Sequence, residues 1–151
     1  MKIVYIGNTG VTYDLETAKK AVAQLGDATF EIAGPGYRYL NREELEQFLA
    51  EADVGLVPMA PESCVGVPYK FADYAKAGLA IVSSLGGESG ALLRKYGAGA
   101  EYQPHDVKSL IAALEGIRPN LAEIKANSRR MAECEFDARE IYRRYVEYVT
   151  A

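Results

Sequence analysis

Cysteine, histidine and tryptophan are scarce in this sequence: its 151 residues include two cysteines, one histidine and no tryptophan. Cys64 and Cys134 lie far apart, without the close spacing of a metal-binding or redox pair, so we expect free thiols in a reducing compartment. His105 directly precedes Asp106, a helix-capping residue, and is expected in an exposed loop. A Ser/His/Asp or Cys/His catalytic set therefore has little support, and no metal is expected because no residues have the spacing of metal ligands.

Long apolar runs are also absent. None approaches the ~20 residues that a membrane-spanning helix needs, and residues 1–7 are too short an apolar stretch for a signal peptide. We therefore predict no transmembrane segment and a cytoplasmic protein. Positive charge is not in excess either, since the net charge is −4 and the pI about 5.1. An acidic chain does not attract nucleic acid through its overall field, so no nucleic-acid partner is expected and any phosphate must be held locally.

The composition that remains is typical of a globular protein, with 49% hydrophobic and 25% charged residues. The length suits one domain over residues 1–151. Apolar runs at 2–7, 28–33, 54–57, 79–82 and 100–102 alternate with segments of helical periodicity. This alternation predicts an α/β fold, a Rossmann-like three-layer sandwich with a parallel sheet of about five strands and helices on both faces. Two amphipathic helices form a C-terminal tail. The last is expected to pack on the core, and the alternative is an exposed apolar face that would indicate a missing partner or a dimer.

Ligands are expected at the loops that follow the strands. The carboxyl ends of parallel strands share one edge of the sheet, and helices that start there point free N–H groups into the same space. These loops are residues 8–13, 34–39, 58–70 and 83–90. The first follows Gly7 and contains Gly10 but has no GxGxxG pattern, so a dinucleotide fingerprint is absent.

The most informative stretch is 67–84, Val-Pro-Tyr-Lys-Phe-Ala-Asp-Tyr-Ala-Lys-Ala-Gly-Leu-Ala-Ile-Val-Ser-Ser. It resembles the Ser-Pro-Asn-Lys-Leu-Phe-Glu-Tyr-Met-Ala-Ala-Gly-Leu-Pro-Val-Val pattern of GT-B glycosyltransferases. The segment Ala-Asp-Val-Gly-Leu-Val-Pro at 52–58, Gly-Gly-Glu at 86–88 and Pro-His-Asp at 104–106 also stand where that family has similar residues. The likeness is close over residues 52–114 and loose elsewhere. It indicates the donor-binding C-terminal domain of an enzyme of the glycosyl transferases group 1 type.

The resemblance implies a binding role for the helix within 67–77. Asp73 stands where the family has the glutamate that binds the ribose hydroxyls of the donor, and a carboxylate accepts from two vicinal hydroxyls at once. Pro68 in the first helical turn leaves the N–H groups of Tyr69 and Lys70 free to face a diphosphate, and the helix dipole adds roughly 0.3–1 kcal/mol. Lys70 adds a full charge. The alternatives are a solvated Asp73 and a surface Lys70 whose stem packs over the sheet.

A second cradle is expected where glycines precede a helix N-terminus, because such a segment can build an anion-binding nest. Its candidate residues are Gly86, Gly87 and Glu88. Gly66, lacking a side chain, would let the backbone approach a sugar phosphate. Glu88 has the alternative of serving only as a favourable partner of the helix dipole.

Two features depart from the family pattern. Many retaining GT-B enzymes carry a first glutamate near the transferred sugar. Seven residues separate it from the glutamate that binds the ribose, and Val65 stands at that position here. Glu62, three residues earlier, is the candidate catalytic residue if the loop bends back. The family's basic pair after the first strand is missing, so Arg38 or Lys70 must balance the phosphates.

Together these features predict a nucleotide-sugar-binding domain, half of a GT-B glycosyltransferase, partnered by an N-terminal acceptor-binding domain. The implied reaction transfers a hexose from a nucleoside diphosphate sugar to a glycan or lipid acceptor, as in cell-envelope polysaccharide biosynthesis. It would be metal-independent and would show little turnover without the acceptor domain. Two alternatives remain: a non-catalytic nucleotide-binding or regulatory α/β domain, and a flavodoxin-like domain that binds another phosphate ligand.

Overall fold

Five short parallel strands form one sheet, in the order β2-β1-β3-β4-β5. The computed structural model describes residues 1–150. The strands are β1 (Lys2–Ile6), β2 (Thr29–Ala33), β3 (Val54–Val57), β4 (Ala80–Ser83) and β5 (Gly99–Glu101). The helices are α1 (Leu15–Gln24), α2 (Arg42–Ala50), α3 (Tyr69–Ala77), α4 (Gly87–Tyr96), α5 (Val107–Ile117), α6 (Leu121–Glu135) and α7 (Ala138–Thr150), with a 3₁₀ turn at Arg118–Asn120. The predicted parallel sheet of about five strands is confirmed.

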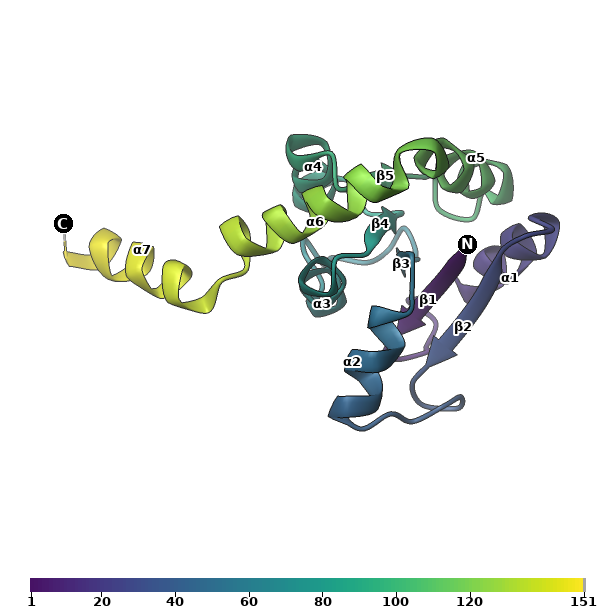
Figure 1. Ribbon diagram of the computed structural model, residues 1–151, viewed down its shortest axis with the longest axis horizontal. Helices are drawn as coiled ribbons and strands as arrows, with labels where there is room; N and C mark the ends of the chain where they lie inside the picture. Colours follow the sequence, from purple (N-terminus) through teal and green to yellow (C-terminus); the bar gives the residue numbers. More distant parts are fainter. Residues whose placement is uncertain (151) are drawn as a thin grey trace.

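Helices cover both faces of this sheet, which gives the predicted three layers (Figure 1). One face packs on α1 and α5, where Ala18, Val22, Leu110 and Leu114 are buried. The other face packs on α2, α3, α4 and α6. Side chains of a strand alternate between the two faces, so Ile3 of β1 joins the first core and Val4 the second.

The strand order places a switch point between β1 and β3. The chain leaves β1 toward β2 on one side and then crosses back to β3 on the other, so the connections diverge at the carboxyl ends of these strands. Only α2 lies between β2 and β3, which explains the small sheet. In open α/β sheets the crevice at such a point is where ligands bind.

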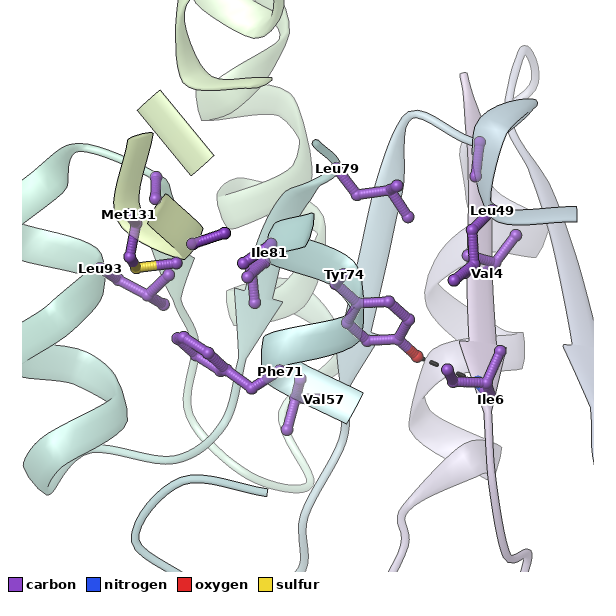
Figure 2. Close-up of a cluster of buried hydrophobic side chains, with 14 of the residues drawn as sticks. Val4, Ile6, Leu49, Val57, Phe71, Tyr74, Leu79, Ile81, Leu93 and Met131 are labelled. Carbon is purple, nitrogen blue, oxygen red and sulfur yellow. Dashed lines mark hydrogen bonds between the residues drawn. The ribbon is translucent and has the colours of Figure 1, made fainter. Parts of the chain in front are cut away.

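Tyr74 of α3 fills the gap where β1 and β3 separate. These two strands pair in register only at Ile3 with Val54 and Val4 with Gly55. Farther along, the Tyr74 hydroxyl accepts from the Ile6 N–H at 3.0 Å (Figure 2). It also donates to the Leu56 carbonyl at 3.2 Å, so one buried side chain replaces the missing strand pairing. The contact also fixes α3 against the end of β1.

The last helix does not pack on the core, so that expectation was wrong. No residue of α7 is buried, and the helix extends away from the rest of the chain (Figure 1). Both faces of the sheet are already covered, and the final apolar contact with the core is that of Phe136 with Phe71, whose ring centroids are 6.2 Å apart. The apolar residues of α7 are left exposed: Ile141, Tyr142, Tyr145, Val146, Tyr148 and Val149. No helix within residues 1–150 is long and apolar enough to cross a membrane.

A chain that ends after Asp137 should therefore be as stable as the full chain. Truncation at this point keeps Phe136 and removes no buried side chain of α7. We expect the free energy of unfolding in urea to change by less than about 0.5 kcal/mol, as for changes away from the core. A loss of 2 kcal/mol or more would show that α7 contacts the domain in solution.

Candidate functional site

A pocket of about 660 Å³ opens at the carboxyl edge of the sheet, beside the switch point. It lies between the ends of β1 and β2, the start of α3 and the 34–40 loop. Its lining is mainly apolar and aromatic, with few polar groups. The lining residues are Ile6, Gly7, Asn8, Tyr13, Ala33, Gly34, Pro35, Tyr39, Leu40, Leu45, Val65, Val67, Pro68, Tyr69, Lys70 and Asp73.

The N-terminus of α3 faces this pocket. Pro68 is the N-cap and supplies no side-chain hydrogen bond, and the Phe71 N–H is satisfied by the Pro68 carbonyl at 2.9 Å. The N–H groups of Tyr69 and Lys70 have no partner within residues 1–150. Unpaired amides at a helix N-terminus are donors for an anion, and the helix dipole favours negative charge there.

The Lys70 side chain is buried against two tyrosine rings. Lys70 as a whole is 8% exposed, and its Nζ atom lies 4.0 Å from the ring centroid of Tyr13 and 4.7 Å from that of Tyr5. The Tyr5 hydroxyl accepts from Nζ at 3.3 Å and donates its own proton to the Asn8 carbonyl. The two rings are tilted at 59° with centroids 5.7 Å apart. We call Tyr5 and Tyr13 the aromatic seat of Lys70.

No carboxylate within residues 1–150 forms an ion pair with this amine. Burial lowers the pKa of Lys70 from its ordinary value of 10.5 to about 8. A cation buried without a counter-charge is costly unless a ligand supplies the charge. The amine therefore gives the pocket an uncompensated positive charge while it keeps its proton.

Asp73 lines the same pocket one turn farther along α3. Its carboxylate is exposed, yet partial burial raises its pKa, an effect that the nearby charge of Lys76 partly offsets. The side chain also lines the groove between α2 and α3. Asp73 and the free amides of α3 thus share one pocket, as the resemblance requires.

Two glycines allow the β1 and β2 ends to approach each other beneath the pocket. Gly34 has φ +152°, and a Cβ there would lie 2.1 Å from the Gly7 carbonyl oxygen. Gly7 has φ +120°, and a Cβ on it would lie 3.3 Å from the Lys70 Nζ. Any other residue at Gly7 would narrow the space above the amine, so the backbone here is shaped for close approach to a ligand.

The second predicted cradle lies outside this pocket. Gly86 is the N-cap of α4 without a side-chain bond, and Gly87 has φ +56°. Gly66 packs on this helix start: its carbonyl accepts from the Ser89 hydroxyl, and a Cβ on Gly66 would lie 2.6 Å from a Glu88 carboxylate oxygen. Of the predicted binding residues, Pro68, Tyr69, Lys70 and Asp73 therefore form one group and Gly66, Gly86, Gly87 and Glu88 a second.

Glu62 belongs to neither group. It is exposed in the loop between β3 and α3 and is not among the lining residues of the pocket. Val65, which stands in the register of the family's first glutamate, does line the pocket. Of the two cations considered for the phosphates, Lys70 lines the pocket and Arg38 does not.

His105 lies across the same edge of the sheet in an exposed loop, as expected. It has the left-handed φ of 60°, and its Nδ1 lies 2.8 Å from Asp14 Oδ2. Burial raises the pKa of Asp14, but the hydrogen bonds from Thr17 and the neighbouring His105 outweigh it, so the net shift is downward. This pair joins the loops after β1 and β5. No group of three or more His, Cys, Asp or Glu side chains in the described part of the chain is arranged to hold a metal.

The aromatic seat was not predicted from the sequence. Tyr5 has the pattern of a core strand residue, and nothing local indicates that its hydroxyl faces a lysine 65 positions away. Tyr13 lies in a loop that was assigned to the ligand edge, which is the one signal that could have identified it. Tyr39, 87% exposed, also borders the pocket and was visible only as a loop aromatic. Tyr69, predicted as a binding residue through its N–H group, is 94% exposed at the same pocket.

The switch-point pocket, with a helix N-terminus and a buried cation, is typical of α/β domains that bind phosphate-containing ligands. No protein-family model and no curated protein sequence matches the chain. Among solved structures, it is similar to sucrose-phosphate synthase from Thermosynechococcus elongatus, with TM-score 0.77, 16% identity, and coverage of 99% of this chain and 44% of that chain. HepE from Anabaena in complex with UDP gives TM-score 0.81 and 15% identity over 99% of this chain and 48% of that chain.

A third similar structure is the catalytic domain of cholesterol-α-glucosyltransferase from Helicobacter pylori. Its TM-score is 0.64 at 17% identity, with coverage of 88% of this chain and 95% of that chain. The chain spans about half the length of the first two proteins. It has the Rossmann-like fold of the C-terminal half of GT-B glycosyltransferases.

Proposed function

We propose that this chain binds a nucleoside diphosphate sugar as the donor domain of a glycosyltransferase. The observation that carries the proposal is the shared pocket: Asp73 and the two residues with free amides, Tyr69 and Lys70, line one cavity at the switch point. In this arrangement Asp73 accepts hydrogen bonds from the ribose hydroxyls while the helix N-terminus holds the diphosphate. Structures of HepE were determined with UDP and with UDP-glucose, and the similarity to that fold supports the choice of ligand.

The second group extends the donor site toward the sugar in this proposal. Gly86, Gly87 and Glu88 begin α4, and Gly66 lies against them, so a sugar phosphate that leaves the pocket past Val65 would meet this second helix N-terminus. Glu62 stays the candidate catalytic residue, and its role requires the loop to bend toward the donor. Helix N-termini and Lys70 stabilise the leaving diphosphate, so we propose transfer without a metal ion.

The remaining parts of the proposal concern the whole enzyme. Because the chain covers about half of the similar proteins, we propose that an N-terminal domain binds the acceptor, a glycan or lipid, and that this chain alone shows little transfer. A cytoplasmic enzyme of cell-envelope polysaccharide biosynthesis fits such an acceptor. The exposed apolar residues of α7 are consistent with a surface that another domain covers.

A second candidate is a domain that binds the nucleotide without transferring a sugar. Val65 favours it, since an apolar side chain lines the pocket where the family has a glutamate near the transferred sugar. Sugar transfer from the donor, measured after an acceptor domain is supplied, separates the two candidates. Transfer that depends on Glu62 supports the enzyme, whereas tight donor binding with no turnover supports the binding module.

The donor proposal predicts one preferred nucleotide whose affinity depends on Asp73. In calorimetric titrations with UDP, GDP, ADP and their sugars, Asp73→Ala should weaken the preferred ligand by about 10- to 100-fold, the usual effect of hydrogen bonds to a charged group. Glu43→Ala, which removes an exposed carboxylate on α2, is the matched control and should change nothing. Equal affinities for Asp73→Ala and the unaltered chain would exclude the ribose role.

A further inference from the structure

The chain lacks the basic pair after β1 that the family uses, yet one cation is buried in the pocket. Lys70 enters from α3, and its amine lies beneath Gly7, the residue after β1. The aromatic seat holds that amine beside the loop that follows β1. Lys70 has three N–H donors, of which one is used by the Tyr5 hydroxyl.

The groups around the amine do not neutralise it. From β1 it meets Tyr5, whose own hydroxyl proton is committed to the Asn8 carbonyl, and burial raises the pKa of that phenol. From the loop after β1 it meets the ring of Tyr13. Asp73 on α3 is the carboxylate that lines the pocket, and it forms no ion pair with Lys70. Ring faces attract a cation more weakly than phosphate oxygens do, so the two free donors are available to an anion.

We propose that Lys70, positioned by the aromatic seat, is the phosphate-binding cation of this pocket, and that a nucleoside diphosphate binds tightly only while this amine keeps its proton. The inference rests on the proposed function and adds a proton linkage to it. Burial without a counter-charge makes the amine release its proton near pH 8, and two phosphates placed against it hold the proton to much higher pH. Ligand binding above pH 8 must therefore take up a proton.

The first test uses inorganic pyrophosphate and UDP at pH 7. Lys70→Met should weaken both by about 10- to 100-fold, since a charge-assisted contact is lost. Lys20→Met, an exposed lysine on α1, is the matched control and should have no effect. Equal binding of both ligands by Lys70→Met and the unaltered chain would overturn the inference, and would leave the proposed function intact if Asp73→Ala still weakens UDP. Pyrophosphate binding that needs Lys70, without binding of any nucleotide, would support the cation and overturn the proposed function.

The second test is the pH profile of UDP affinity between pH 7 and 9.5. The diphosphate keeps its full charge over this window, because its last phosphate pKa is near 6. The uracil ring begins to lose its N3 proton toward the upper end, an effect common to all variants. An amine that titrates near 8 in the free protein and above 10 in the complex predicts about 20- to 30-fold weaker binding at pH 9.5 than at pH 7. Lys70→Arg keeps its charge throughout and should lose affinity only through ionisation of the uracil ring, while Asp73 and both tyrosines remain. The loss of about 20- to 30-fold is therefore measured relative to this variant. A profile equally steep in Lys70→Arg would assign the proton to another group and overturn the inference.

The contribution of the aromatic seat can be measured as the midpoint of the same pH profile. Tyr13→Leu removes the ring nearest Nζ and should move the midpoint to lower pH by about half to one unit, because the cation–π contact no longer favours the charged amine. Tyr13→Phe keeps the ring and should keep the midpoint. An unchanged midpoint in Tyr13→Leu would show that the ring only packs there.

Discussion

Replacing Gly55 with alanine should lower the free energy of unfolding by about 4–6 kcal/mol, which is a large part of the stability of an ordinary domain. A Cβ at this position would lie 2.3 Å from the Tyr74 ring, which is fully buried and cannot swing away. The ring must shift, and its hydroxyl then loses Ile6 and Leu56 across the gap between β1 and β3 (Figure 2). The loss of stability therefore has two causes, overpacking of the core and two backbone groups left without a hydrogen-bond partner.

Urea unfolding of a small set of variants checks this prediction. Gly116→Ala is the matched control: this glycine is exposed on α5 with open space around it, so alanine should stabilise by about 0.5–1 kcal/mol. Tyr74→Phe keeps the ring and should cost about 2–3 kcal/mol through the lost hydroxyl. In a Tyr74→Leu background the added cost of Gly55→Ala should shrink by more than half. Additive costs would contradict a direct clash.

Replacing Lys70 with methionine should stabilise the ligand-free protein at pH 7 by about 1–2 kcal/mol, the opposite of the usual effect of a buried substitution. The folded state keeps a charged amine in a dry site, and the aromatic seat offsets only part of that cost. Methionine has similar length and no charge. A gain in stability on replacement is the result expected of a residue that contributes to a site and not to the fold.

The change in the free energy of unfolding with pH is a second test of the buried charge, and its direction follows from the two pKa values of Lys70. The pKa of Lys70 is about 8 in the folded chain and 10.5 in the unfolded one, so between these values the unfolded state binds more protons. The contribution of Lys70 to the free energy of unfolding is therefore lowest below pH 8, and it rises by on the order of 3 kcal/mol toward pH 10.5. The stability advantage of Lys70→Met should therefore shrink as the pH rises and change sign before pH 10.5. A constant difference, or a methionine variant less stable at pH 7, would contradict the buried charge.

The sequence predicts the fold well because its signals are local. Asp14 and Asp106 cap the helices that follow them, and Asn41 with Glu44 forms a capping box, a pattern that is readable in the sequence. Gly78 ends α3 in the left-handed conformation. The position of α7 could not be predicted, because an amphipathic pattern does not say whether any apolar surface is left to receive the helix.

The candidate site could be predicted only in part. The motif at 67–84 indicated α3 and its start, and the structure brings Lys70 and Asp73 to one pocket. The seat of Lys70 depends on Tyr5 and Tyr13, which meet it through the strand order and the φ angles of Gly7 and Gly34. Such contacts between distant segments have no local signature in the sequence.

Amide chemical shifts would show directly whether the start of α3 binds a nucleotide. In the proposed complex, the free N–H groups of α3 bind the diphosphate and Asp73 holds the ribose. Titration of the ¹⁵N-labelled full chain with UDP, GDP and ADP should give saturable shifts for one of them, largest at the amides of Tyr69 and Lys70, and Asp73→Ala should weaken the binding. If every nucleotide leaves these two amides unmoved, or the shifts gather on another part of the chain, this pocket is not the nucleotide site.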